Sequence, residues 1–326
     1  MNLDNPIIAT LDRAGHTESV HRGAWALVRL GSDGGFDVVD AAGDPTQQIF
    51  ARSAMKGLQA LPVVESGAAD AFDFTEAELA IACASHSSEP PHLRTVATML
   101  HKGGLSEDQL RCGASTQWFQ GATGQRRRSY HGCSGKHAAM LLTALHRGEA
   151  PADYLSPSSQ TQRAVRAAVA DMTGADLTDG IDGCSAPTFR MPLHALALGL
   201  ARLTNPAGLC AERAAASDRI TAAAAARPEM IGGEIERFDT DLIRATGGRV
   251  FTKMGAEGVF VCGVRGSGHG LCLRVDDGTE RAIHKLAPRI LRDHDLIDSS
   301  EFDALSKWAS LDRYNADHLH CGTITL

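Results

Sequence analysis

The chain has 326 residues, 43% of them hydrophobic, and a formal net charge of −7. A chain of this length can bury a sizeable core, and we expect a single domain over residues 1–326. Its only basic run, Arg126-Arg127-Arg128, is short, which argues against a nucleic-acid partner. The sequence shows neither a leader-like N-terminus nor an apolar segment of membrane-spanning length, so we expect a cytoplasmic protein with no membrane partner.

Strand patterns come first along the chain. Residues 23–41 alternate in polarity around a turn from Gly31 to Gly35, which predicts a β-hairpin. The pair Thr75 and Glu78 then forms a capping box that opens a helix. Further helices are expected within residues 91–104, 135–148, 158–174, 192–203, 219–230 and 280–294, and strands within residues 249–255, 258–264, 270–277 and 322–326.

The order of these elements predicts the fold class. Strands occur at both ends of the chain and helices between them, which favours an α+β fold. We expect an antiparallel sheet built from both chain ends, helices packed on it, and an inserted, mainly helical part at about residues 75–245.

The stretch RSAMKGLQA, residues 52–60, holds a Ser-x-x-Lys motif made by Ser53 and Lys56. On a helix these two side chains share a face. The motif alone is also found on solvated helix surfaces. Two other polar clusters strengthen it, the stretch ASHSSEPPH with Ser85, and a late strand with Lys253-Met254-Gly255. Penicillin-recognising serine enzymes order their parts in this way.

The chemistry explains why such groups would be needed together. A serine hydroxyl is a weak nucleophile until a base takes its proton, and a lysine can be that base only in its neutral form. Burial and a second nearby cation favour the neutral form. Lys253 is a candidate for that cation and Ser85 for a proton relay. Taken singly, each could equally be an ordinary surface or capping residue.

A second constellation involves cysteines. The eight cysteines are scattered through the chain, so a disulfide framework is not expected. Cys133 opens a predicted helix that continues with Lys136 and His137, while Asp182 and Cys184 lie in a glycine-rich loop. The spacing of these residues is compatible with three interpretations: a zinc site, two buried thiols, or a Cys133 nucleophile paired with His137.

Five motifs occur together in a characteristic order: RSAMKGLQ, SHSSEPPH, CSGKHAAML, DGCSAPTF and KMGAEGVF. With them the chain resembles the asparaginase II family of Rhizobium type, the class 3 L-asparaginases, from ESVHRG at residues 18–23 to the KMGAEG strand. The resemblance implies hydrolysis of L-asparagine to L-aspartate and ammonia. It also implies a fold similar to serine β-lactamases and glutaminases, and a homodimer.

Carried over by position, the resemblance makes Ser53 the nucleophile and Lys56 its base, with Ser85 and Lys253 as a second Ser-Lys pair. It further implies a zinc ion that helps to place the substrate. Its ligands would be Cys133, Lys136, Cys184 and water, with Asp182 nearby.

Arg52 is a candidate anchor for the substrate α-carboxylate, because a guanidinium can bind a carboxylate through two hydrogen bonds. A structural ion pair is the alternative role. Asp182 is counted with Arg52 as a substrate-binding candidate.

Two other functions remain as alternatives. A penicillin-recognising hydrolase would use the same serine and lysine, but Ser85-His86-Ser87 is not the usual Ser-x-Asn, and Lys-Met-Gly replaces Lys-Thr-Gly. A zinc-dependent binding protein would hold metal through Cys133 and Cys184 without turnover.

Overall fold

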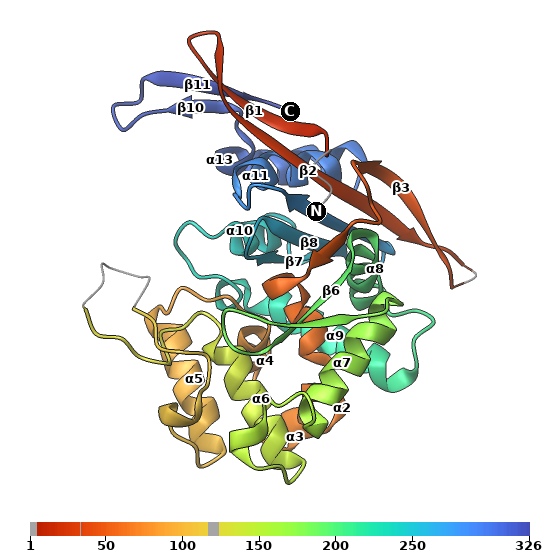
Figure 1. Ribbon diagram of the computed structural model, residues 1–326, viewed down its shortest axis with the longest axis vertical. Coiled ribbons are helices and arrows are strands. Elements are labelled where there is room, and N and C mark those ends of the chain that lie inside the picture. Colours follow the sequence, from red (N-terminus) through yellow and green to blue (C-terminus); the bar gives the residue numbers. More distant parts are fainter. Residues whose placement is uncertain (1–4, 33, 117–123) are drawn as a thin grey trace.

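The computed structural model describes residues 5–32, 34–116 and 124–326, and places a large sheet above a group of helices (Figure 1). Neighbouring strands in the large sheet follow the order β10-β11-β1-β2-β9-β8-β7, with β3 also paired to β2, and every pair is antiparallel. The N-terminal strands β1 and β2 thus lie between strands from the C-terminal part. The predicted α+β fold, with an antiparallel sheet from both chain ends, is confirmed. The strands are β1 Ile7–Arg13, β2 His16–Leu30, β3 Phe36–Ala42, β7 Val250–Gly255, β8 Val259–Val264, β9 His269–Val275, β10 Asp312–Tyr314 and β11 His320–Thr325.

The predicted hairpin is present between β2 and β3, with Leu30 opposite Phe36. Asp33 of its turn lies outside the described residues. Strands β1 and β10 were not expected from the sequence, and β11 begins before the predicted 322–326 segment. Strand β10 has no buried residue, and exposed residues interrupt the buried positions of β1 and β11, which weakens the strand signal.

The predicted capping box is also confirmed. The Thr75 hydroxyl accepts a hydrogen bond from the Glu78 backbone N–H at 3.3 Å, and the Glu78 carboxylate accepts one from the Thr75 N–H at 2.7 Å. These bonds satisfy N–H groups that have no partner within the helix itself. The helices are α1 Lys56–Gln59, α2 Leu61–Glu65, α3 Ala68–Ala71, α4 Glu76–Ala82, α5 Pro90–Lys102, α6 Ser134–His146, α7 Gln160–Thr173, α8 Leu193–Thr204, α9 Ala211–Ala226, α10 Phe238–Ala245, α11 Arg281–Asp293, α12 Ser299–Ala304 and α13 Ser306–Ala309.

A second, small sheet was not predicted. Its strand order is β4-β6-β5, and it joins residues that are far apart in the chain. Two of its strands fall inside the part predicted to be mainly helical, and the division of the chain at about residues 75–245 stays a prediction. Its strands are β4 Gln48–Phe50, β5 Thr178–Ile181 and β6 Pro187–Pro192.

Helix α8 packs directly against the large sheet because two glycines face it. Gly263 of β8 and Gly270 of β9 are register partners. A methyl group on Gly263 would lie 2.5 Å from the Leu200 carbonyl oxygen, and one on Gly270 would clash with the Ala197 carbonyl. Backbone atoms of a packed helix cannot move aside as a flexible side chain can.

We therefore expect Gly270→Ala to destabilise the protein by about 1–3 kcal/mol, the usual range for overpacking a core. Urea denaturation measures the effect as a lower midpoint at unchanged slope. Gly180→Ala is the matched control, because its methyl group would meet only the Phe50 ring, which is partly exposed and can move. Equal stability of the two variants would contradict this account of the α8 contact.

Within the described residues, no helix is both long and apolar enough to cross a membrane.

Candidate active site

Ser53 lies on a short 3-10 helix, η1 Arg52–Met55, which leads directly into α1. Arg52, just before it, has a left-handed backbone with φ of 50°. Such a conformation is costly for a non-glycine residue and is found most often at functional sites. The end of strand β7 packs closely on this turn, since a methyl group on Gly255 would lie 3.0 Å from the Ala54 backbone nitrogen. Glycine in the Lys-Met-Gly motif thus lets β7 approach the turn that carries Ser53.

Lys56 is completely buried and has three hydrogen-bond acceptors among the described residues. Its Nζ donates to the Ala84 carbonyl, to Ser85 Oγ at 3.0 Å and to Cys133 Sγ at 3.1 Å. Ser53 is not one of the three. The buried amine therefore connects the loop of Ser85 with the cysteine cluster, three residues after the candidate nucleophile.

The Ser85 segment is held from two sides. Ser85 N–H donates to the Ile231 carbonyl at 3.0 Å, and the next residue, His86, donates to the Gly132 carbonyl at 3.0 Å. The half-buried Arg237 guanidinium donates to the Ser85 carbonyl at 2.6 Å. These bonds fix the position of the Ser85 hydroxyl next to Lys56.

Lys253 has a different partner from the one expected. The predicted coupling was with Ser85, but Lys253 Nζ donates to Asp239 at 3.1 Å and to the Met254 carbonyl at 2.8 Å. Burial lowers the pKa of Lys253, and the positive charge of Lys56 lowers it further, whereas Asp239 opposes the shift. The charge of Lys56 thus acts on Lys253, and the hydroxyl of Ser85 bonds to Lys56, while the expected effect of Lys253 on Lys56 stays a prediction.

The expected zinc ligands lie together in a buried cluster. Lys136 Nζ donates to Cys184 Sγ at 3.3 Å, and the thiol of Cys184 also bonds to Cys133. That bond, with the charges of Lys56 and Lys136, holds the pKa of Cys133 well below its usual range against the effect of burial. The pKa of Cys184 is raised by the same bond and by burial. Of the two thiols, Cys133 is therefore the one that loses its proton more readily.

The donor set fits zinc only if the lysine is included. Among the described residues no group of three or more His, Cys, Asp or Glu side chains could hold a metal ion. Two cysteine sulfurs are ligands that zinc prefers, whereas a lysine amine is a rare one that binds only in its neutral form, and these three groups leave a fourth position open. Although burial lowers it, the pKa of Lys136 is raised overall by Cys184, Cys133 and Asp182, so zinc would have to displace a proton from this amine.

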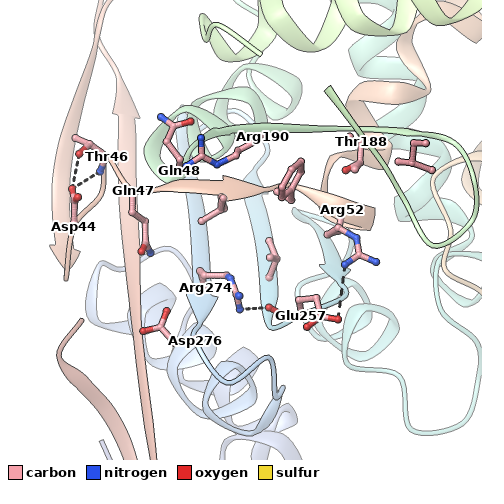
Figure 2. A pocket seen from close by; sticks show the side chains of 15 residues that line it. Asp44, Thr46, Gln47, Gln48, Arg52, Thr188, Arg190, Glu257, Arg274 and Asp276 are labelled. Carbon is pink, nitrogen blue, oxygen red and sulfur yellow. Dashed lines mark hydrogen bonds and ion pairs between the residues drawn. The ribbon is translucent and has the colours of Figure 1, made fainter. Parts of the chain in front are cut away.

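Arg52 and Asp182 form an ion pair at the outer side of this cluster. Arg52 Nε donates to Asp182 Oδ1 at 2.6 Å. Figure 2 shows Glu257 on the same guanidinium, at a distance of 3.9 Å. Burial raises the pKa of Asp182, but the hydrogen bond from Arg52 and the charge of Lys136 lower it below its usual value. Cys184 Sγ is 3.5 Å from the other carboxylate oxygen. The predicted substrate-binding pair thus adjoins the predicted metal ligands.

Comparison with known protein families gives a match that spans the motifs described above. Residues 9–326 match the sequence profile of the family described as L-asparaginase II. The chain belongs to the L-asparaginase II family. The resemblance inferred from the motifs is therefore confirmed, and membership implies an amidohydrolase. Comparison with curated proteins gave no significant match.

Comparison with solved structures finds proteins of low sequence identity to this chain. A crystal structure described as a β-lactamase from Mycobacterium bovis has 13% sequence identity and a TM-score of 0.44, covering 88% of this chain and 95% of that one. The native form of a protein named Mglu has 16% identity and a TM-score of 0.40, covering 91% and 69%. Mglu in 4.3 M NaCl has 15% identity and a TM-score of 0.38, covering 85% and 61%.

The sequence analysis did not identify two residues of the site. Asp239 contacts the predicted residue Lys253, and Arg237 contacts the predicted residue Ser85. Both lie at the start of α10, in the stretch RFDTD. Acidic residues in a first helical turn are a general helix-start signal. This signal could have located the start of α10, but it could not have shown which residues Asp239 and Arg237 contact.

Proposed function

We propose that this chain is an L-asparaginase that hydrolyses L-asparagine to L-aspartate and ammonia through an acyl-enzyme on Ser53. One observation carries the proposal: a fully buried lysine, Lys56, stands three residues after Ser53 and is hydrogen-bonded to a second serine, Ser85. A buried amine with a hydroxyl acceptor is suited to proton transfer rather than to solvation. Family membership supplies the substrate class.

In the proposed first step, Ser53 Oγ attacks the side-chain amide carbon of asparagine while Lys56 takes the hydroxyl proton. The protonated Lys56 then gives this proton to Ser85, which lies within hydrogen-bond distance and passes its own hydroxyl proton to the leaving nitrogen, so that ammonia departs and Lys56 is neutral again. Water then attacks the ester, aspartate is released, and the serine hydroxyl is restored. The Ser53 backbone N–H is a candidate donor to the negative oxygen that forms at each attack.

Arg52 is proposed to hold the α-carboxylate of the substrate. Its guanidinium has Asp182 on one edge, which fixes its orientation, and remains partly exposed. An arginine held in this way can offer its other edge to a carboxylate. The ion pair and the substrate contact are compatible, so the two roles weighed for Arg52 coexist in this proposal.

Zinc is proposed as a bound metal held by Cys133, Lys136 and Cys184. When bound, it would supply a fixed positive charge that helps to place the substrate. The thiolate character of Cys133 supports metal binding, because thiolates are the form that coordinates zinc. The chemistry at the amide carbon stays with Ser53.

The test is release of ammonia from asparagine and from glutamine, with hydrolysis of a chromogenic β-lactam followed in parallel. We expect turnover with asparagine, and the same three assays are repeated after chelation. Hydrolysis of the β-lactam alone would favour a penicillin-recognising enzyme, and metal binding without any turnover would favour a binding protein. The homodimer implied by the family resemblance is checked on the same sample by light scattering.

For the metal, we expect Cys184→Ser to reduce the zinc content of the purified protein and to raise KM more than it lowers kcat. A contact that contributes mainly to ground-state binding has this kinetic effect, and Ser53 remains in place. Zinc is measured directly on the protein, and steady-state kinetics give the two constants. Cys210→Ser is the control, because Cys210 is exposed and lies outside this cluster.

Two results would contradict the metal proposal. A wild type without zinc, together with unchanged kinetics in Cys184→Ser, would leave only two buried thiols. Loss of kcat at constant KM would instead move the chemistry from Ser53 to a metal-bound water.

A further inference from the structure

A cavity of about 730 Å³ lies beside the candidate active site, between the small sheet and one end of strands β8 and β9 (Figure 2). Its lining meets the active site at Arg52 and Glu257, but includes neither Ser53 nor any of the proposed zinc ligands. A volume of this size is typical of sites for small organic molecules, which are roughly 300–1,000 Å³.

Strand β6 presents two polar groups to this cavity that lack a partner. Thr188 and Arg190 are two residues apart, so their side chains lie on the same face of the strand. Thr188 is only 2% exposed, and its Oγ1 has no hydrogen-bond partner in the described part of the chain. The half-buried Arg190 guanidinium likewise has no hydrogen bond or ion pair among the described residues.

A buried hydroxyl without a partner, as at Thr188, is uncommon in folded proteins. Leaving a buried hydroxyl without a hydrogen bond costs about 1–3 kcal/mol, so nearly all buried polar groups have a partner in the protein or in bound molecules. An unpaired guanidinium and an unpaired hydroxyl on one strand face form a pair of donors for an anion.

The acidic groups in the cavity wall do not fill that role. Each of the three lining carboxylates faces a partner other than Arg190, and none of them forms an ion pair with Arg190. The pairs are Asp44 with Thr46 at 2.6 Å, Asp276 with Asn5 at 3.1 Å, and Glu257 with Arg52 at 3.9 Å.

Apolar side chains form the rest of the binding surface. Phe50 of β4 is the register partner of Arg190, so the ring and the guanidinium lie side by side. Ile181 is 86% exposed at the cavity, and Val259 is buried in its wall. A ligand with an anionic group at Arg190 and an apolar part in contact with Phe50 and Ile181 would match both the charged and the apolar parts of the cavity wall.

We propose that this cavity is a second ligand site, centred on Arg190 and adjoining the asparagine site at Arg52, for a small monoanion with an aromatic or branched apolar body. Its carboxylate or sulfonate accepts hydrogen bonds from Arg190 and Thr188, and its body covers Phe50 and Ile181.

The test uses the fluorescent probe 8-anilino-1-naphthalenesulfonate and its neutral counterpart N-phenyl-1-naphthylamine, which lacks the sulfonate. We expect the wild type to bind the sulfonate probe at one site and to release it when 3-phenylpropionate is added. Arg190→Gln should weaken binding of the sulfonate about 10-fold or more, because a hydrogen bond to a charged group is lost. Thr188→Val, of similar shape, should weaken it by a smaller factor, and neither variant should change binding of the neutral probe.

Matched variants distinguish binding at this site from nonspecific binding of the probe. Arg190→Lys keeps the charge and should recover most of the affinity, and Arg29→Gln removes an exposed arginine outside the cavity and should leave binding unchanged. Equal binding of the sulfonate to wild type and Arg190→Gln would overturn the proposal. So would absence of binding to the wild type, as expected if water or a second copy of the chain fills the cavity. Binding is measured without asparagine, so an inactive protein with intact probe binding would refute the proposed function alone.

Discussion

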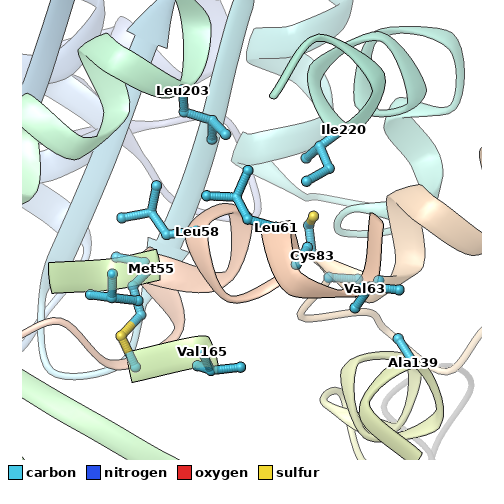
Figure 3. Packing of buried hydrophobic residues seen from close by; sticks show 14 of the residues in the cluster. Met55, Leu58, Leu61, Val63, Cys83, Ala139, Val165, Leu203 and Ile220 are labelled. Atoms are coloured by element: carbon cyan, nitrogen blue, oxygen red, sulfur yellow. The ribbon is translucent and has the colours of Figure 1, made fainter. Parts of the chain in front are cut away.

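Ser53→Ala is expected to lower kcat for asparagine hydrolysis by about a thousand-fold or more, in line with the loss of a serine nucleophile in other hydrolases. The fold should survive, because the turn is anchored by its neighbours. Met55 and Leu58 point into the core beside Leu61 (Figure 3) and are essentially unexposed. Ammonia release gives kcat, and thermal unfolding should give the wild-type Tm.

Lys56→Met is the companion variant for this prediction. It keeps the buried stem and removes the amine, so it should be nearly as damaging as Ser53→Ala. Mass spectrometry of protein quenched during turnover should find the acyl group on Ser53 in the wild type and on no residue in Ser53→Ala. An acyl group on another side chain would refute the nucleophile, and a normal rate in Lys56→Met would mean that another group takes the proton.

Asp239→Asn is expected to destabilise the protein by about 3 kcal/mol or more, the usual cost of breaking a buried ion pair by removing one partner. Lys253 and Asp239 are 0% and 1% exposed in their side chains. The same carboxylate accepts the Met254 backbone N–H at 2.9 Å. The side-chain amide of an asparagine would place its own N–H groups next to the Lys253 amine and the Met254 N–H, which are also donors. Urea denaturation should therefore show a large loss of stability.

Two controls make this prediction specific. Adding Lys253→Met to Asp239→Asn should recover much of the lost stability, because no unpaired charge is then buried. Glu234→Gln removes the carboxylate of an exposed pair with Arg244 and should cost about 1 kcal/mol or less. A loss in Asp239→Asn no larger than in Glu234→Gln would show that the buried pair contributes little.

The pH dependence of the Asp239→Asn effect follows from the pKa of Lys253. Burial already lowers that pKa in the wild type, and without Asp239 it should fall further. Between the folded and unfolded pKa values the unfolded chain binds more protons, so stability rises with pH. The deficit of the variant should therefore narrow as pH approaches about 10, where the lysine of the unfolded chain also loses its proton. A constant deficit would indicate a cause other than the unpaired charge.

Much of the fold was predictable because its signals are local. The capping box of Thr75 and Glu78 acts over three residues, and the hairpin of β2 and β3 depends on a glycine-rich turn next to strand patterns. The apolar run of β8 reflects its burial at every position, and the apolar residues of β7 and β9 reflect burial at most of theirs. The strands at both chain ends were then enough to predict an α+β fold.

The candidate residues could also be named from the sequence, because each motif keeps its chemical groups within a few positions. Their partners could not. Spacing gave no reason to prefer Lys56 over Lys253 as the partner of Ser85, and the predicted coupling of Ser85 with Lys253 differs from the observed hydrogen bonds. Asp239 was not considered at all, although it holds Lys253.

The sequence by itself determined the family, strands β2, β3, β7, β8 and β9 with most of the longer helices, and which residues carry reactive groups, since all of these follow from short motifs and local periodicity. Only the tertiary structure decided which groups meet. Gly255 brings β7 against the turn of Ser53, and the small sheet places Arg190 beside Phe50, 140 positions earlier in the chain. Contacts of this kind depend on how whole elements pack, and packing is set by the shape of many side chains at once rather than by the residues near either partner.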